Sequence, residues 1–180
     1  MMSDKNITED KKNIQNQVMW NRLLSVVEEQ GQTLIRTAFS PIVRECGDIS
    51  AGIFDLDGRM MAQAVTGTPG HVNSMAESVK HFINHFPLNT MSEGDIFITN
   101  DPWMGTGHLN DFVITTPCFK NNKIVGLFSC TSHLTDIGGL GVGPDATIKA
   151  LARGFNCCCY LIRCGRLQPS DFLGGRWIQN

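Results

Sequence analysis

Two apolar segments separated by a short polar turn constrain the fold of this chain most strongly. Residues 112–119 and 124–131 both have the composition of buried strands, and Lys120-Asn121-Asn122-Lys123 lies between them. Two strand-like segments joined by so short a polar connection are typical of an antiparallel pair. The sequence therefore predicts a β-hairpin over this region.

The predicted hairpin brings together residues that flank its two strands. A turn centred between Asn121 and Asn122 places His133 opposite Asn110, between His108 and Asp111. A shift of one or two residues in register keeps this proximity. We therefore expect two imidazoles and a carboxylate to meet at one end of the hairpin.

The rest of the chain predicts a mixed fold. Apolar residues recur at helical spacing from Ile14 to Ile35, which indicates one long helix ending before Pro41. Further along, the patterns predict a hairpin over 48–63, a helix over 74–86 and a strand over 94–99. Residues 1–147 are thus expected to form an α+β domain with antiparallel hairpins behind a long N-terminal helix.

Composition excludes several classes of protein. A length of 180 residues suits one domain, and a net charge of −2 favours neither nucleic acid nor an anionic membrane as a partner. No apolar run is long enough to span a bilayer, and the charged N-terminus lacks a secretory signal, so we expect a cytoplasmic protein. In that reducing compartment, Cys46, Cys118 and Cys130 are expected to be small apolar fillers.

The predicted cluster has the chemistry of a metal site. Two histidines and one carboxylate, His108, Asp111 and His133, suit a divalent ion such as Mn²⁺, Fe²⁺ or Zn²⁺. Asp136 is a candidate fourth ligand, or an acceptor that orients a histidine. Each residue also has a simpler interpretation, because a loop histidine is usually solvated and Asp111 is suited to capping a turn. Spacing alone leaves both interpretations open.

Other polar residues are weaker indications of a site. Asp48 and Asp101 are candidate polar groups beside the metal, or equally turn residues, and His71 is a further candidate in a predicted loop over 66–71. His81 and His85 have the spacing of paired ligands without the HExxH motif, so a solvated helix face is expected. The Asp55-Leu56-Asp57-Gly58 segment resembles a calcium loop but lacks the final Glu, which favours a turn.

Four segments together resemble the hydantoinase B/oxoprolinase family. They occur in the family's order and span roughly Val18 to Thr147: Leu34-Ile35-Arg36-Thr37-Ala38-Phe39-Ser40-Pro41, Gly94-Asp95-Ile96-Phe97-Ile98-Thr99-Asn100-Asp101-Pro102, Gly107-His108-Leu109-Asn110-Asp111 and Ser132-His133-Leu134-Thr135-Asp136-Ile137-Gly138-Gly139. That family includes the N-methylhydantoinase B subunit, 5-oxoprolinase and the large subunit of acetone carboxylase.

The resemblance implies a function. In the carboxylase branch it implies a manganese site at His108, Asp111 and His133, with ATP bound by a partner A-type subunit of a hetero-oligomer. The leading hypothesis is a fragment of the B subunit of an ATP-dependent cyclic-amide hydrolase. The alternatives are a subunit of an ATP-dependent ketone carboxylase, with a ketone as the small substrate, and a non-catalytic metal-binding remnant.

Residues 148–180 depart from the family pattern. They contain five Lys or Arg and one Asp, and include Cys157-Cys158-Cys159, whereas the rest of the chain is acidic. We hypothesise that this atypical tail is read in a shifted frame, so that 1–147 is the N-terminal part of a truncated domain. Whether such a fragment is active alone does not follow from the sequence.

Overall fold

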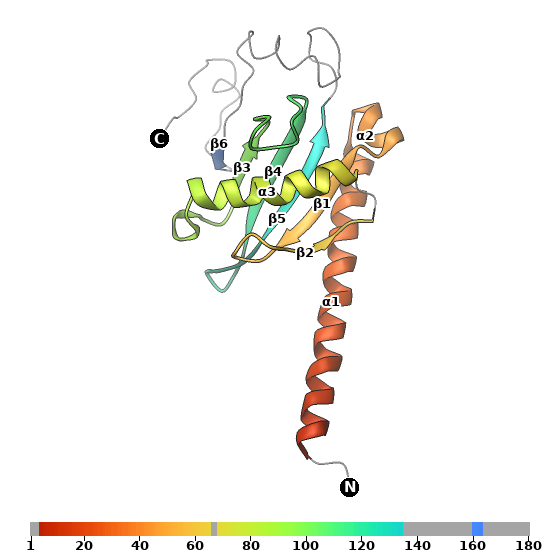
Figure 1. Cartoon of the computed structure of the whole chain (residues 1–180), viewed down its shortest axis with the longest axis vertical. Coiled ribbons are helices and arrows are strands. Elements are labelled where there is room, and N and C mark those ends of the chain that lie inside the picture. The colour runs from red at the N-terminus through yellow and green to blue at the C-terminus, as the bar shows by residue number, and fades with distance from the viewer. Residues whose placement is uncertain (1–3, 66–67, 135–159, 164–180) are drawn as a thin grey trace.

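The computed structural model describes residues 4–65, 68–134 and 160–163, which form an α+β fold (Figure 1). This agrees with the fold class expected from the sequence. The elements in chain order are α1 (Asp4–Thr37), α2 (Pro41–Cys46), β1 (Ile49–Phe54), β2 (Met60–Gln63), α3 (Pro69–His85), the 3₁₀ helix η1 (Leu88–Thr90), β3 (Asp95–Thr99), β4 (Asp111–Lys120), β5 (Lys123–His133) and β6 (Tyr160–Arg163).

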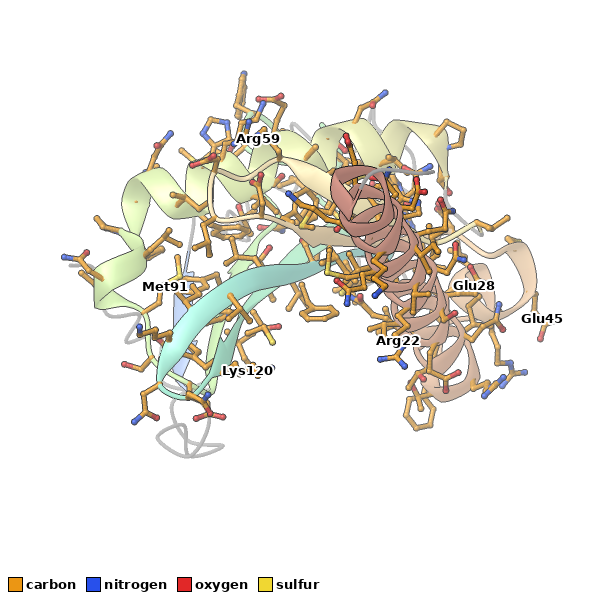
Figure 2. All side chains as sticks on the ribbon, turned by 90° about the horizontal axis from the view of Figure 1, so that it is seen from below. Arg22, Glu28, Glu45, Arg59, Met91 and Lys120 are labelled. Atoms are coloured by element: carbon orange, nitrogen blue, oxygen red, sulfur yellow. The ribbon has the colours of Figure 1, made fainter. Side chains whose placement is uncertain are left out.

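The strands form one sheet in the order β2-β1-β5-β4-β3-β6, and each neighbouring pair is antiparallel. Helix α3 crosses one face of this sheet, as Figures 1 and 2 both show. The main core lies between α3 and the sheet, and its largest members are Phe54, Met75, Phe82, Phe97 and Leu127. The candidate functional residues lie beyond this core, at one end of β1, β4 and β5.

Helix α1 covers part of the sheet beside β1 and β2. Its Val27 is buried with Ala51, Ile53 and Ala62, whereas Phe54 of the same strand packs in the α3 cluster. Because side chains alternate along a strand, α1 and α3 cover opposite faces of β1. This explains why every residue of β1 is buried.

The long N-terminal helix is confirmed, but it begins well before Ile14 and only part of it belongs to the core. The N-terminal half projects away from the sheet, as Figure 1 shows, and its Ile14, Val18 and Met19 are exposed. The C-terminal half packs through Val27, and Gln30 Nε2 donates to the backbone oxygen of Ser129 at 3.0 Å. The apolar periodicity therefore predicted the helix without showing how much of it packs on the sheet.

The first hairpin has the predicted turn. Asp55 Oδ1 accepts hydrogen bonds from the backbone N–H groups of Asp57, at 3.0 Å, and of Arg59, at 2.8 Å. The Arg59 guanidinium also pairs with both carboxylates. The aspartates therefore stabilise a tight turn, and the turn interpretation is preferred to a calcium loop.

The second hairpin contains a bulge that the sequence analysis did not anticipate. Asn121 and Asn122 have φ angles of 52° and 60°, the left-handed conformation that two-residue hairpin turns require, and Lys120 pairs with Lys123. The pairing then shifts between Cys118 and Phe119, so that Cys118 pairs with Gly126 and Val125 is the extra residue. The predicted pairing of His133 with Asn110 is therefore wrong, and His133 pairs with Asp111 instead.

Helix α3 begins five residues earlier than predicted. Thr68 occupies the N-cap position and Pro69 lies in the first turn, where its missing N–H costs no hydrogen bond. The predicted loop over 66–71 is therefore wrong at its C-terminal end, and His71 belongs to the first helical turn.

The three cysteines of the described region differ in environment. Cys130 is buried and Cys118 is half-buried, as expected for small apolar residues, but Cys46 is exposed. The expectation for Cys46 is therefore wrong, because it lies in the last turn of the short, largely exposed α2.

A short part of the atypical tail extends the sheet. Tyr160–Arg163 pairs with β3 as an edge strand, and the remainder of the predicted tail lies outside the described residues. Among the helices that the structure describes, none has the length and apolarity needed to cross a membrane.

Candidate metal centre

Three adjacent inner strands of the sheet bring the candidate site together at one of their ends. Asp48 directly precedes β1, Asp111 begins β4, and His133 ends β5. Because β5 is antiparallel to both neighbours, these three positions lie side by side. The backbone N–H of His133 also donates to the backbone carbonyl oxygen of Asp48 at 3.3 Å.

The loop before β4 positions His108. The Asn100 side chain donates to the Leu109 oxygen at 2.9 Å, and the backbone N–H of Asp111 donates to the His108 oxygen at 3.1 Å. Gly107 has a φ of 84°, a conformation that L side chains rarely adopt. These contacts hold the loop in a turn that directs His108 toward Asp111.

Asp111 is the centre of the cluster and is 3% exposed. Its Oδ1 lies 2.7 Å from His133 Nδ1 and 3.6 Å from His108 Nδ1. Its Oδ2 accepts a hydrogen bond from Thr106 Oγ1 at 2.7 Å and lies 3.1 Å from His71 Nε2. The structure thus brings together His108, Asp111 and His133, and it adds His71. Asp136 lies outside the described residues.

Asp48 and His71 complete a second side of the cluster. Asp48 Oδ1 lies 3.6 Å from His71 Nδ1, and Asp48 Oδ2 lies 3.8 Å from His133 Nδ1. Thr68 Oγ1 donates to Asp48 Oδ1 at 2.8 Å, so the N-cap residue of α3 fixes this carboxylate. In the sequence, both residues are weaker indications of a metal site than His108, Asp111 and His133. The Thr68-Pro69 pair, a typical helix start, was the signal that places His71 in α3.

Other residues considered in the sequence analysis have structural roles. Asp101 Oδ1 accepts from the backbone N–H groups of Trp103, at 2.8 Å, and Met104, at 3.2 Å, which is the pattern of a turn. On α3, His85 Nδ1 lies 2.9 Å from the His81 oxygen and His85 is exposed. Neither histidine belongs to the cluster around Asp111.

The electrostatics of the cluster favour an ionised Asp111. Burial alone raises the pKa of its carboxyl, but hydrogen bonds with His71, Thr106 and His133 and the charge of His71 outweigh burial and lower the pKa to about 2. Burial also opposes protonation of His71, yet its hydrogen bond to Asp111 and the charges of Asp111 and Asp48 raise its pKa. A carboxylate is therefore present at neutral pH.

The donor atoms fit a metal ion. His71 Nδ1, His108 Nε2 and His133 Nε2 are buried and have no hydrogen-bond partner within the described part of the chain. Buried unpaired polar atoms are costly in the absence of a ligand. The ligand atoms of His108, Asp111 and His133 lie within 4.8 Å of one another. The ring centroids of the two imidazoles are 5.0 Å apart. Imidazoles with a carboxylate suit Mn²⁺, Fe²⁺ or Zn²⁺.

Known proteins of similar sequence and structure identify the family of this chain. The chain is 32% identical to 5-oxoprolinase 1 of Arabidopsis thaliana over 130 residues, which cover 72% of this chain and 10% of that protein. It superposes on an ATP-dependent caprolactamase from Pseudomonas jessenii with a TM-score of 0.66 and 22% identity, covering 87% of this chain and 27% of the other.

A second solved structure has the same fold. Nucleotide-free acetone carboxylase superposes with a TM-score of 0.64 and 24% identity, covering 73% of this chain and 17% of the other. The chain spans only a small part of each of these relatives. The sequence profile described as hydantoinase B/oxoprolinase matches residues 12–148, a segment that contains His71, Asp111 and His133. The chain therefore belongs to the hydantoinase B/oxoprolinase family.

Proposed function

We propose that this chain provides a divalent metal centre to an ATP-dependent enzyme that opens cyclic amides, of the N-methylhydantoinase and 5-oxoprolinase type. The observation that supports this most strongly is the contact of three histidines with one buried, ionised carboxylate, Asp111. His108, Asp111 and His133 would hold the ion, with Mn²⁺ as the expected metal and Fe²⁺ or Zn²⁺ as alternatives. We further propose Asp136 as a fourth ligand or an acceptor that orients a histidine.

A divalent ion held by these residues would supply Lewis-acid chemistry, by which a carbonyl or phosphoryl oxygen would be polarised or water activated. The protein's own residues prepare the site for it. Thr106 fixes one oxygen of Asp111 through its hydroxyl hydrogen bond, and the β4–β5 ladder fixes Asp111 and His133 relative to each other. The burial of Asp111 and His133 restricts access of water, which strengthens electrostatic interactions at the site.

We assign ATP to a partner A-type subunit in the cytoplasm rather than to this chain. The sequence contains no GxxxxGK[ST] phosphate-binding loop, whereas two structures with this fold are described as an ATP-dependent caprolactamase and an acetone carboxylase studied for ATP-dependent carboxylation. A subunit that contributes the metal and a partner that activates the substrate would together form the catalytic unit.

Two alternatives have support of their own. The likeness in fold to acetone carboxylase favours a ketone carboxylase, in which a ketone replaces the cyclic amide. A non-catalytic metal-binding or interaction role would rest on the cluster around Asp111 alone, which accounts for metal binding without any turnover.

The test combines the purified chain with an A-type subunit of the same family and ATP, and measures ADP release. We expect release to increase with 5-oxoproline or hydantoin, and this increase to disappear in a His108→Ala/His133→Ala variant. A response to acetone with bicarbonate in place of cyclic amides would favour the carboxylase. Binding of the partner without any turnover would favour the non-catalytic role and contradict the hydrolase.

A further inference from the structure

We propose that two copies of this chain associate through the outer face of α1, with the two helices antiparallel and centred near residue 20. This interface goes beyond the proposed function and does not depend on the metal centre. The N-terminal half of α1 projects away from the sheet in Figure 1, which leaves it open to a second helix.

The projecting part of α1 exposes several large apolar side chains. Ile14 is 63% exposed, Met19 is 55% exposed and Val18 is 47% exposed. A helical segment without tertiary contacts is only marginally stable in water, because most helices in proteins gain their stability by packing an apolar face. The exposed apolar residues therefore indicate a surface that another element covers.

Two sides of α1 have different surroundings. Val27 is buried against the sheet with Ala51 and Ile53. At 3.6 residues per turn, the side of the helix away from Val27 carries residues spaced three or four positions apart. We call this side the outer face, and its exposed residues are Lys11, Ile14, Val18, Arg22, Val26 and Glu29. A partner helix can run along the outer face past residue 27 without meeting the strands.

The outer face is complementary to itself when one copy is reversed. The spacings between its six residues are three, four, four, four and three positions, which are the same from either end. An antiparallel partner centred near residue 20 therefore places Ile14 opposite Val26. It also places Val18 beside the aliphatic part of Arg22. Such reciprocal contacts, in which residue i meets j and j meets i, are those of a two-fold symmetric dimer.

The charges at the two ends of the outer face favour the antiparallel arrangement. Lys11 of each copy lies opposite Glu29 of the other, whereas a parallel dimer would place like charges together. In the part of the chain that the structure describes, neither residue has an ion-pair partner. The adjacent Glu28 is used within the chain, because it accepts a hydrogen bond from the backbone N–H of Val65 at 2.9 Å. Glu29 is therefore the carboxylate available to a second copy.

The test measures the molar mass of the full chain by sedimentation equilibrium over a range of concentrations. We expect a monomer–dimer equilibrium in the wild type and a monomer in Val18→Asp, which would bury a charge between the helices. Lys11→Glu and Glu29→Lys each replace two attractive pairs by two repulsive ones, and we expect each to weaken dimerisation about tenfold. Lys123→Glu makes the same change at an exposed residue of the hairpin and is the control, with an unchanged dimer.

Mixing the two charge variants makes the test specific for the antiparallel pairing. In a mixed dimer of Lys11→Glu with Glu29→Lys, both facing pairs at these positions again have opposite charges. We therefore expect the mixture to dimerise as tightly as the wild type, with circular dichroism confirming that each variant keeps its helix.

Three results would overturn the proposal. A wild-type chain that stays monomeric would assign the outer face to a different protein. A dimer that Val18→Asp and Lys11→Glu both leave intact would form through another surface. A dimer that the single charge variants weaken, but that their mixture does not restore, would rule out the antiparallel pairing.

Discussion

His133 and Asp111 face each other across the β4–β5 ladder, and His133 Nδ1 lies 2.7 Å from Asp111 Oδ1. This contact depends on the bulge at Val125, because without the extra residue His133 would pair with Asn110. The bulge lies at the opposite end of the hairpin from the two residues. A local irregularity near the turn therefore sets the register that assembles the candidate metal centre.

Removing the charge of Asp111 should weaken metal binding more than any other single change. Asp111→Asn keeps the shape of the side chain but removes the anion, and we expect Mn²⁺ affinity to fall by at least about 100-fold, the upper range for loss of residues that only support ligands. Isothermal titration calorimetry measures this. Asp57→Asn, in an exposed turn, is the control and should bind as the wild type does. Equal affinity in the Asp111→Asn variant would contradict the assignment.

The stability of the sheet near the bulge should depend on the absence of a side chain at Gly126. A Cβ at this position would lie 2.9 Å from the backbone oxygen of Phe54, which cannot move without disturbing β1. We expect Gly126→Ala to lower the free energy of unfolding by about 1–3 kcal/mol. Gly70→Ala meets no atom within 4 Å and lies in α3, so it should leave stability unchanged or raise it by up to about 1 kcal/mol. Urea denaturation compares the two, and equal stabilities would refute the close approach.

The core between α3 and the sheet should dominate stability. Phe82 is fully buried and packs against Phe97, with the ring centroids 6.0 Å apart. We expect Phe82→Ala to cost about 3–5 kcal/mol of unfolding free energy. Phe39→Ala makes the same chemical change at a side chain that is 99% exposed, and should change stability by less than about 0.5 kcal/mol. A loss in Phe39→Ala comparable to that in Phe82→Ala would show that the two environments are wrongly assigned.

The cysteines should differ in reactivity. Burial raises the pKa of the Cys130 thiol from 9.0 to about 11, so it remains protonated at pH 8, whereas Cys46 is exposed. Iodoacetamide should modify Cys46 in the native chain and Cys130 only after unfolding, as measured by peptide mass spectrometry. The stability that the buried neutral thiol contributes should be present below about pH 9 and disappear as pH rises toward 11. Rapid native labelling of Cys130 would contradict its burial.

The sequence predicted the elements of the fold better than their boundaries. Alternation, apolar runs and turn residues identified both hairpins and the long helix because each of these patterns is local. The start of α3 was missed because Pro69-Gly70 was interpreted as part of a loop, although proline is favoured in a first helical turn. The unpacked half of α1 was not predictable, since its apolar residues have the same spacing as those that pack.

The same distinction applies to the site. His108, Asp111 and His133 were found because their proximity follows from one hairpin, and that proximity tolerates a register error of one residue. Asp48 and His71 were placed lower because their approach depends on three elements, β1, β5 and the N-terminus of α3, whose arrangement is a tertiary property. Asp136 stays a prediction, and so does the frame-shifted origin of residues 148–180.

The central claim is that His108, Asp111 and His133 bind a divalent metal. Its most direct test is the metal content of the purified chain, measured by inductively coupled plasma mass spectrometry beside a His108→Ala/His133→Ala variant. We predict near-stoichiometric or higher Mn, Fe or Zn in the wild type and loss of at least one equivalent in the folded variant. A folded wild-type chain that remains empty after incubation with Mn²⁺, Fe²⁺ and Zn²⁺, or a variant with unchanged metal content, would contradict the claim.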